Sequence, residues 1–220
     1  GIWLGIIFSG FSLTLAIFMP IIGRLSDKKG RKRFITSGLL SYSLISLLYP
    51  FAAKVYYLTG VRLIHGLASA MVVPVAMAYI GDIAEKGKEG RYMGTFNMAL
   101  LFGTGAGPFL GGFINDSFGV ASVFYAMAGF TAIAFLISLV FLPDIRYSRI
   151  RKIGNPVSFV EIFKNNIMKG VLLYNAISSM GRGGIMAFLP IFGAKIDINP
   201  SLVGIIVSSH IFLLALLQRP

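Results

Sequence analysis

The chain has 220 residues, of which 56% are hydrophobic and 13% are charged, and its formal net charge is +12. Soluble domains carry about 25% charged residues, so this chain has too little polar surface to cover a soluble globule of its size. The composition therefore indicates an integral membrane protein. A basic nucleic-acid-binding protein is excluded because the cations lie in short gaps between apolar runs and do not form amphipathic faces.

Seven apolar runs are long enough to be membrane-spanning helices, since such a helix needs about 20 mostly apolar residues. In chain order the expected spans are 2–22, 34–53, 55–80, 92–114, 120–142, 167–192 and a last one that starts near residue 202. The sequence therefore predicts an all-α integral membrane fold with about seven transmembrane helices.

The cations between these runs are distributed very unequally over the two sides of the membrane. If every run crosses, one side holds only Lys54 and Lys195, and nearly all the other Lys and Arg residues between the runs lie on the opposite side. The positive-inside rule assigns the cation-rich side to the cytoplasm of a multi-pass inner (plasma) membrane protein. The expected cytoplasmic segments are 23–33, 82–91 and 143–166.

The longest gap between apolar runs, residues 143–166, predicts a domain boundary. It is basic and contains two prolines. Its segment VSFVEIFK, residues 157–164, fits either a short amphipathic helix on the membrane surface or an ordinary solvated linker. We expect a first helical bundle over 1–142, a cytoplasmic linker over 143–166 and the start of a second bundle over 167–220.

An internal repeat extends across this linker. The stretch LGIIFSGFSLTLAIFMP, residues 4–20, is similar to VGIIVSSHIFLLALLQRP, residues 203–220, with a shared Gly-Ile-Ile-x-Ser, then Leu-Ala, then Pro. Parallel repeats of this kind are typical of secondary transporters. The alternative is a chance match between two apolar runs.

The charged stretch GRLSDKKGRKR, residues 23–33, resembles a signature of the major facilitator superfamily, G-x-L-x-D-x-x-G-R-K/R, found between transmembrane helices 2 and 3. The matching positions are Gly23, Leu25, Asp27, Gly30, Arg31 and Lys32. The resemblance implies a fold of two pseudo-symmetric six-helix bundles. If the first span corresponds to helix 2, the chain is expected to be a fragment that covers helices 2 to 8 of twelve, without helix 1.

In that family this loop is a conformational latch that holds the two halves in the outward-facing state. The resemblance implies that Gly23 allows close helix approach and that Asp27 lies near a helix N-terminus of the other half. It also implies that Arg31 pairs with an acid at the cytoplasmic end of helix 4, where Asp82 stands. The alternative is that Asp27 only reduces the repulsion within a cluster of cations.

Residues 94–112, GTFNMALLFGTGAGPFLGG, are similar to the helix 5 motif of family members that exchange a substrate against protons and are mostly exporters. The positions of this G-x8-G-x3-G-P-x2-G-G pattern are Gly94, Gly103, Gly107, Pro108, Gly111 and Gly112. Small residues let membrane helices pack closely, and a proline bends a helix. The motif therefore favours an antiporter, with generic glycine packing as the alternative.

Polar residues inside the spans are candidates for a proton or substrate pathway. RLIHGLASA, residues 62–70, resembles the helix 4 motif R-x-x-Q-G, with His65 at the Gln position, and the family's Arg is implicated in proton transfer. Arg62 also fits snorkelling to the interface, and His65 fits a polar group satisfied by packing. Arg182 lies deep in its span among glycines, which favours a cavity over a structural pair, and Asn175 fits either a pathway or an interhelical bond.

No Asp or Glu lies deep in any predicted span, so the proton-carrying acid is expected outside this chain or replaced by another device. The leading interpretation is a proton-coupled exporter of a small molecule, drug-like or a metabolite, that works by alternating access without a cofactor or metal. A sugar or organic-anion uniporter or symporter of the same fold is the alternative.

Other classes of protein fit the sequence less well. A membrane enzyme is not expected, because cysteine is absent and the two histidines are far apart in sequence. A receptor or scaffold does not explain the latch motif. The expected partners are the lipid bilayer, a small-molecule substrate and protons, with no nucleic acid, and the full-length protein is expected to be a monomer.

Overall fold

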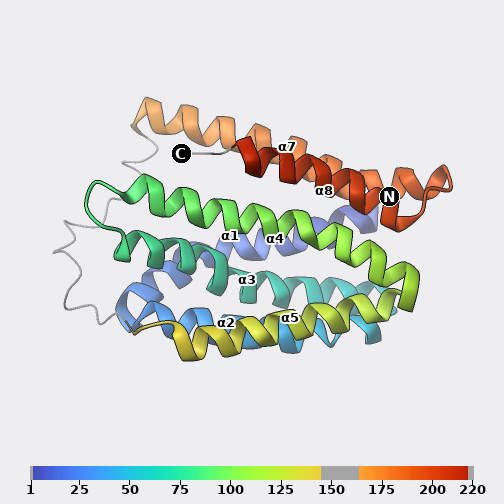
Figure 1. Cartoon of the computed structure of the whole chain (residues 1–220), viewed down its shortest axis with the longest axis horizontal. Coiled ribbons are helices and arrows are strands. Elements are labelled where there is room, and N and C mark those ends of the chain that lie inside the picture. Colours follow the sequence, from blue (N-terminus) through green and yellow to red (C-terminus); the bar gives the residue numbers. More distant parts are fainter. Residues whose placement is uncertain (1, 145–163, 218–220) are drawn as a thin grey trace.

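The computed structural model describes residues 2–144 and 164–217, and this part of the chain consists of long α-helices joined by short connections (Figure 1). The helices are α1 (Ile2–Lys29), α2 (Arg31–Ser46), α3 (Val55–Ile83), α4 (Glu89–Phe118), α5 (Val120–Phe141), α7 (Asn166–Lys195) and α8 (Pro200–Leu217), and a 3-10 turn η1 (Tyr49–Phe51) follows α2. A helix satisfies its own backbone polar groups, which a lipid environment requires. The predicted all-α fold is confirmed.

Within residues 2–144 and 164–217, five helical segments are long and apolar enough to cross a membrane. They are Gly5–Lys29, Arg31–Phe51, Val55–Ile83, Glu89–Phe118 and Val120–Phe141. The apolar helix Pro200–Leu216 is shorter than these, and α7 is interrupted by polar residues and glycines. Five of the seven predicted spans therefore have the length and composition of a membrane helix, and the two that follow the predicted linker stay predictions as spans.

The helix connections gather at two ends of the molecule (Figure 1). We call the end where α1 meets α2 and α3 meets α4 the basic end, because residues 23–33 and 82–91 lie there. The connections that contain Lys54 and Lys195 lie at the opposite end. Most of the predicted linker, residues 145–163, lies outside the described residues.

The predicted loop over residues 23–33 is wrong in its extent. Helix α1 continues through Lys29 and α2 begins at Arg31, so only Gly30 separates the two helices. Gly30 has a φ of 95°, in the left-handed region that favours glycine, which allows the chain to reverse within one residue. The lysines at the end of α1 suit a helix because cations interact favourably with the carbonyl end of the helix dipole.

The first layer of the fold is built from α1, α2, α3 and α5. Helix α3 packs on both α1 and α2, and α2 packs on α5. Gly38 of α2 lies so close to α3 that a Cβ atom there would be 2.7 Å from the Cβ of Met71. Between α2 and α5, the buried Ser43 hydroxyl donates to the carbonyl oxygen of Ala128 at 2.9 Å. Small residues and hydroxyl groups thus allow close helix contact where lipid supplies no hydrophobic drive.

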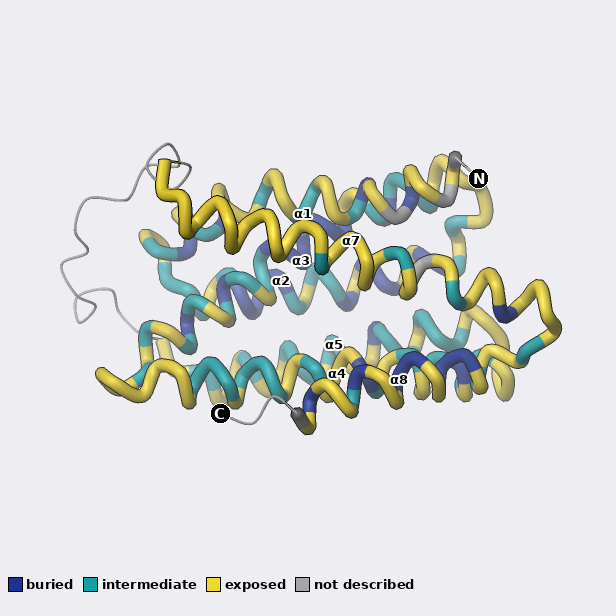
Figure 2. The backbone as a smooth tube through the Cα atoms, turned by 90° about the horizontal axis from the view of Figure 1, so that it is seen from above, coloured by how far each residue is buried: buried dark blue, intermediate teal, exposed yellow. Residues whose placement is uncertain are grey.

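Helix α4 makes its most extensive contact with α8, and its contacts with α3 and α5 are smaller. Helices α4 and α8 lie on either side of the predicted boundary at residues 143–166, and that boundary stays a prediction. Figure 2 shows buried residues on α8 and an almost wholly exposed α7. The helix α7 packs chiefly on α8, and its exposed apolar side chains include Ile167 and Met180.

Candidate functional site

An ion cluster at the basic end is centred on Arg31, in the first turn of α2. Its Nη1 atom lies 2.8 Å from Oδ1 of Asp27, one turn earlier in the chain, and its Nε atom donates to Oδ2 of Asp82. The Arg31 and Asp82 side chains are only 16% and 15% exposed. A guanidinium that bonds two carboxylates from fixed directions holds their three backbone segments in one arrangement.

The chain positions this cluster through its helix ends. Asp27 lies in the last turns of α1 and Asp82 in the last turn of α3, while the single residue Gly30 brings Arg31 back beside them. The end of α5 joins the same region, because the Tyr79 hydroxyl of α3 donates to the carbonyl oxygen of Pro143 at 3.0 Å. The ends of α1, α2, α3 and α5 are therefore linked around this cluster.

The structure brings Arg31, Asp27 and Asp82 together, as the resemblance implies for Arg31 and Asp82. No atom of another described helix lies within 4 Å of the place where a Cβ on Gly23 would stand. Its predicted close approach, and that of Asp27 to a helix of the second half, stay predictions. The latch role of the cluster also stays a prediction.

The second feature is the seam between α4 and α8, where glycines allow the two backbones to touch. A Cβ on Gly112 would lie 2.8 Å from the carbonyl oxygen of Pro200, and one on Gly105 would lie 3.1 Å from the Phe212 ring. From the other side, Gly204 of α8 lies against the carbonyl group of Pro108. Gly112 and Gly204 meet backbone atoms and leave no room for a side chain, whereas the neighbours of Gly105 are side chains in tight contact.

The positions of the helix 5 motif do not share one face of α4. Gly112 and the Pro108 carbonyl face α8, whereas Gly111 faces Val123 of α5 at 3.8 Å. Gly103 and Gly107 have open space around the Cβ position within the described ranges. The remaining motif residue, Gly94, is half-buried near the basic end of α4.

Sequence reasoning missed two glycines of the seam, Gly105 and Gly204. A signal for Gly204 was present, since it occupies the glycine of the repeated Gly-Ile-Ile-x-Ser frame.

An apolar groove of about 390 Å³ lies beside the seam, at the end of the molecule opposite to the basic end. Its lining comes from α4, α5, α7, α8 and the connection before α8, so helices from both predicted halves form it, and Asn115 is a polar side chain within it.

The third feature is a buried polar cluster around His65 of α3. His65 is 3% exposed, and its Nδ1 atom lies 2.7 Å from the hydroxyl of Tyr49 in η1. The Tyr42 ring of α2 contacts the imidazole edge to face, with 3.9 Å between ring centroids. The Arg62 guanidinium lies 5.4 Å from the centroid of the Tyr49 ring. The aromatic rings thus hold the two polar side chains of the predicted helix 4 motif inside the bundle.

The other ring nitrogen of His65, Nε2, is buried and has no hydrogen-bond partner within residues 2–144 and 164–217. A buried polar atom without a hydrogen-bond partner lowers the stability of the folded protein. Sequence reasoning missed Tyr49 and Tyr42, because tyrosines in apolar runs have no distinctive spacing.

Arg182 and Asn175 lie on the exposed surface of α7. Arg182 donates to the Ser179 hydroxyl at 3.2 Å and Asn175 donates to the Val171 carbonyl at 2.9 Å, both within α7. Arg62 and His65 instead lie in α3 around the Tyr49 side chain. The four predicted pathway residues therefore fall into two separate groups.

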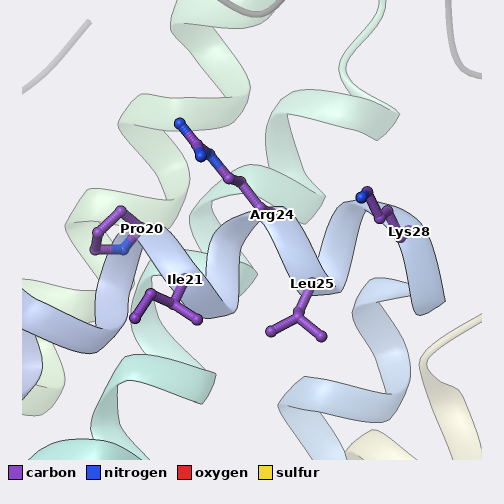
Figure 3. A pocket seen from close by; sticks show the side chains of 5 residues that line it. All are labelled: Pro20, Ile21, Arg24, Leu25 and Lys28. Atoms are coloured by element: carbon purple, nitrogen blue, oxygen red, sulfur yellow. The ribbon is translucent and has the colours of Figure 1, made fainter. Parts of the chain in front are cut away.

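A shallow groove of about 390 Å³ lies on α1 near the basic end (Figure 3). Two rows with a four-residue spacing line it, Pro20, Arg24 and Lys28 in one and Ile21 and Leu25 in the other. Cations above an apolar row suit the boundary between lipid and water. In the described part of the chain, no group of three metal-ligating side chains is present.

Comparison with known proteins places the chain in a family. A family model described as Major Facilitator Superfamily matches residues 3–219. An MFS-type transporter of Methanocaldococcus jannaschii, described as uncharacterized, is 36% identical over 222 residues, which cover 98% of this chain and 57% of that protein. The chain belongs to the major facilitator superfamily, which consists of multi-pass membrane transporters and not of enzymes.

Two further relatives are described as multidrug resistance proteins, and one of them as an efflux pump. The multi-drug resistance efflux pump PmrA of Streptococcus pneumoniae is 33% identical over 140 residues, which cover 64% of this chain and 35% of the pump. The multidrug resistance protein MdtG of Proteus mirabilis is 32% identical over 143 residues, 65% of this chain and 35% of that protein. The chain thus spans between about a third and just over half of the length of these relatives, and its fold is incomplete relative to the full superfamily fold.

Proposed function

We propose that this chain forms part of a proton-coupled secondary transporter that exports a small molecule by alternating access. The observation that carries the proposal is the α4–α8 seam, in which Gly112, Gly105 and Gly204 allow the two helices to touch. These helices lie on either side of the predicted linker, so the seam is a contact between the two predicted halves. A tight contact between halves at the opposite end closes that side of the molecule.

The resemblance of residues 94–112 to an antiporter motif supports the same proposal, because Pro108 and Gly112 of that motif form the seam. The description of one relative as a multi-drug resistance efflux pump supports export. We propose a drug-like molecule or a metabolite as the substrate class.

The ion cluster around Arg31 is proposed to be the latch at the other side of the membrane. The three side chains Asp27, Arg31 and Asp82 connect the ends of α1, α2 and α3, and Gly23 and Gly30 belong to the same segment. A partly buried pair breaks at a moderate cost, which suits a contact that forms and opens in each transport cycle.

The proton and substrate pathway is proposed to include both polar groups of the spans. Arg62 and His65 form the group in the first half, where both lie beside the Tyr49 side chain and imidazole is the side-chain type that exchanges protons near neutral pH. Arg182 and Asn175 form the group on α7, where exposed polar side chains suit a substrate cavity between the halves.

We further propose the placement of the protein in the cell. The basic end faces the cytoplasm of the plasma (inner) membrane, because cations are retained on that side. Residues 1–142 belong to the N-terminal half, 143–166 to a cytoplasmic linker and 167–220 to the C-terminal half. The full-length transporter acts as a monomer.

The test uses a complete transporter that contains these residues, reconstituted in inside-out vesicles with an acidified lumen. Lumenal pH is recorded while a panel of drugs and organic anions is added one at a time. Substrate-triggered release of protons from the lumen is the expected result, because export in a cell corresponds to uptake into an inside-out vesicle.

Two controls define the outcome. Vesicles without the transporter report passive drug partitioning and proton leak. Measurable substrate flux without proton movement would contradict proton coupling and favour a sugar or organic-anion uniporter. Substrate flux accompanied by protons moving in the same direction would favour a symporter.

A further inference from the structure

One polar contact joins the two predicted halves beside the seam. Asp116, near the C-terminal end of α4, accepts a hydrogen bond from the backbone N–H of Ser201 at 3.1 Å, through its Oδ2 atom. The same oxygen accepts a second hydrogen bond from the hydroxyl of Ser201. Ser201 is the second residue of α8, and 85 positions separate it from Asp116 in the chain.

The position of Ser201 makes this contact a helix cap. The first N–H groups of a helix have no partner within the helix, and a side-chain oxygen just before the helix usually accepts from one of them. Here the acceptor comes from a different helix, in the other predicted half. The carboxylate is also favourably placed for its charge, because the N-terminus of a helix carries partial positive charge.

Close backbone packing holds the two groups in register. One turn before Asp116, Gly112 lies against the backbone of Pro200 and Ser201, and a Cβ there would be 2.9 Å from the Cα of Ser201. The cap therefore forms only when Gly112 is in contact with the start of α8. The glycine contact alone contains no polar group, so the hydrogen bonds to Asp116 fix the orientation of the two helix ends. The two interactions form one unit.

We propose that Asp116 is a positioning residue that holds the opposite end of the transporter closed by capping α8 across the two halves. The inference rests on the proposed alternating access and adds a residue to it. Opening of that end separates α4 from α8, which exposes both the Asp116 carboxylate and the first turn of α8 to water. The cap thus biases the molecule toward the state in which this end is shut.

The experiment measures access to the seam in a complete transporter that contains these residues. The chain has no cysteine, so a single Val207→Cys reporter can be introduced, with any cysteine elsewhere in the transporter replaced. Val207 is 6% exposed in the core of the seam. A membrane-impermeant maleimide is added to intact cells from outside. Asp116→Ala is expected to raise the labelling rate of this reporter by about fivefold to tenfold, the shift expected when one helix cap is lost.

Matched variants separate the cap from general disturbance. Asp116→Asn keeps an oxygen that can accept from the Ser201 N–H, so its labelling rate is expected to lie between those of the parent and Asp116→Ala. Ser117→Ala, on the same turn of α4, is expected to leave the rate unchanged. Equal labelling in the parent and Asp116→Ala would overturn the proposal.

A cross-link tests the same contact without relying on the stability of the alanine variant. In a transporter with Asp116→Cys and Ser201→Cys, oxidation is expected to form a disulfide and stop export, and a reductant is expected to restore the rate of the reduced form. Failure to cross-link, or undiminished export after cross-linking, would contradict the inference. The labelling experiment needs no substrate. Its result therefore tests the Asp116 cap even if the proposed proton coupling is wrong.

Discussion

Gly66 of α3 lies directly against the backbone carbonyl of Phe11 in α1, so that a Cβ atom at Gly66 would stand 2.5 Å from that oxygen. The same atom would lie 3.0 Å from the Cβ of Thr14. One of these neighbours is main chain, so a side chain at this position requires the two helices to separate. The close approach of α1 and α3 is therefore possible only because residue 66 has no side chain.

We expect Gly66→Ala to destabilise the protein by about 1–3 kcal/mol, the usual cost of overpacking a close contact. The measurement is the temperature at which detergent-purified protein loses its monodisperse peak. Gly60→Ala, on the same helix, is the control because no atom of another described helix lies within 4 Å of its Cβ position. That change is expected to be neutral or slightly stabilising, since alanine favours a helix. Equal losses in both variants would contradict the packing argument.

The motif glycines of α4 are expected to differ in their tolerance of alanine. Gly112→Ala places a Cβ 2.8 Å from a backbone oxygen of α8 and is expected to lower export severalfold, because neither backbone can yield without opening the seam. Gly107→Ala meets open space in the described structure and is expected to keep most of the activity. Export rates and protein amounts in membranes are measured together. A similar loss in both variants would show that the motif acts through helix flexibility instead of through this contact.

The ion cluster predicts that geometry matters as well as charge. Arg31→Lys keeps the cation but has no planar fork to reach both Asp27 and Asp82, so transport is expected to fall while membrane insertion is unchanged. Asp27→Asn is expected to weaken transport in the same way. Arg33→Lys, an exposed cation two residues later, is the control and is expected to be silent.

A double-mutant cycle isolates the pair at the centre of this cluster. Arg31→Gln and Asp82→Asn, made singly and together, are expected to show a coupling of about 1–3 kcal/mol in thermal stability, as for a hydrogen-bonded charge pair that is partly desolvated. Additive effects would mean that the contact contributes nothing measurable to stability.

For the transport measurement on the same cluster, normal transport by the Asp27→Asn variant would contradict the latch role.

The Tyr49–His65 pair predicts an asymmetry between single and double changes. Tyr49→Phe leaves the buried His65 Nδ1 atom without its partner and is expected to cost about 1–3 kcal/mol. Adding His65→Leu removes the stranded group, so the double variant is expected to lose less than the sum of the single variants. Thermal stability in detergent checks both expectations, and strictly additive losses would contradict them.

His65→Gln separates a proton role from packing. The titratable and charged groups described around His65 are Tyr42, Tyr49 and Arg62. Glutamine can still bond Tyr49 but does not titrate, so stability is expected to be kept while the pH dependence of export changes. An unchanged pH profile would assign His65 to packing alone.

The sequence predicts the helices well because membrane spans are determined by local composition. Where the prediction is wrong, at residues 23–29 and 31–33, the reason is that helical hydrogen bonding does not stop where the apolar run stops. The pairing of Arg31 with Asp82 is also implied by the sequence, through its resemblance to a family signature. Local signals and known motifs thus account for the helices and for one of the three features of the site.

The remaining contacts depend on how helices cross, which composition does not encode. Gly107 and Gly112 are equivalent in the motif, yet only Gly112 meets α8, because the rotation of α4 decides which face touches its neighbour. The bond from Ser201 to Asp116 joins residues 85 positions apart, and the sequence shows each only as an ordinary polar residue at a helix end. Such contacts follow from the three-dimensional arrangement.

Proline is distributed unevenly among the long helices. Helices α1, α3, α4 and α7 each contain one in their interior, at Pro20, Pro74, Pro108 and Pro190, whereas α2 and α5 contain none. A proline has no amide hydrogen, so each of the four helices lacks one rung of its hydrogen-bond ladder and bends more easily there. Helices α2 and α5, which contain no proline and are joined by the hydrogen bond from Ser43 to Ala128, form the most rigid pair of the first layer. Among the helices, deuterium uptake by backbone amides should therefore be fastest near the four prolines and slowest along α2 and α5.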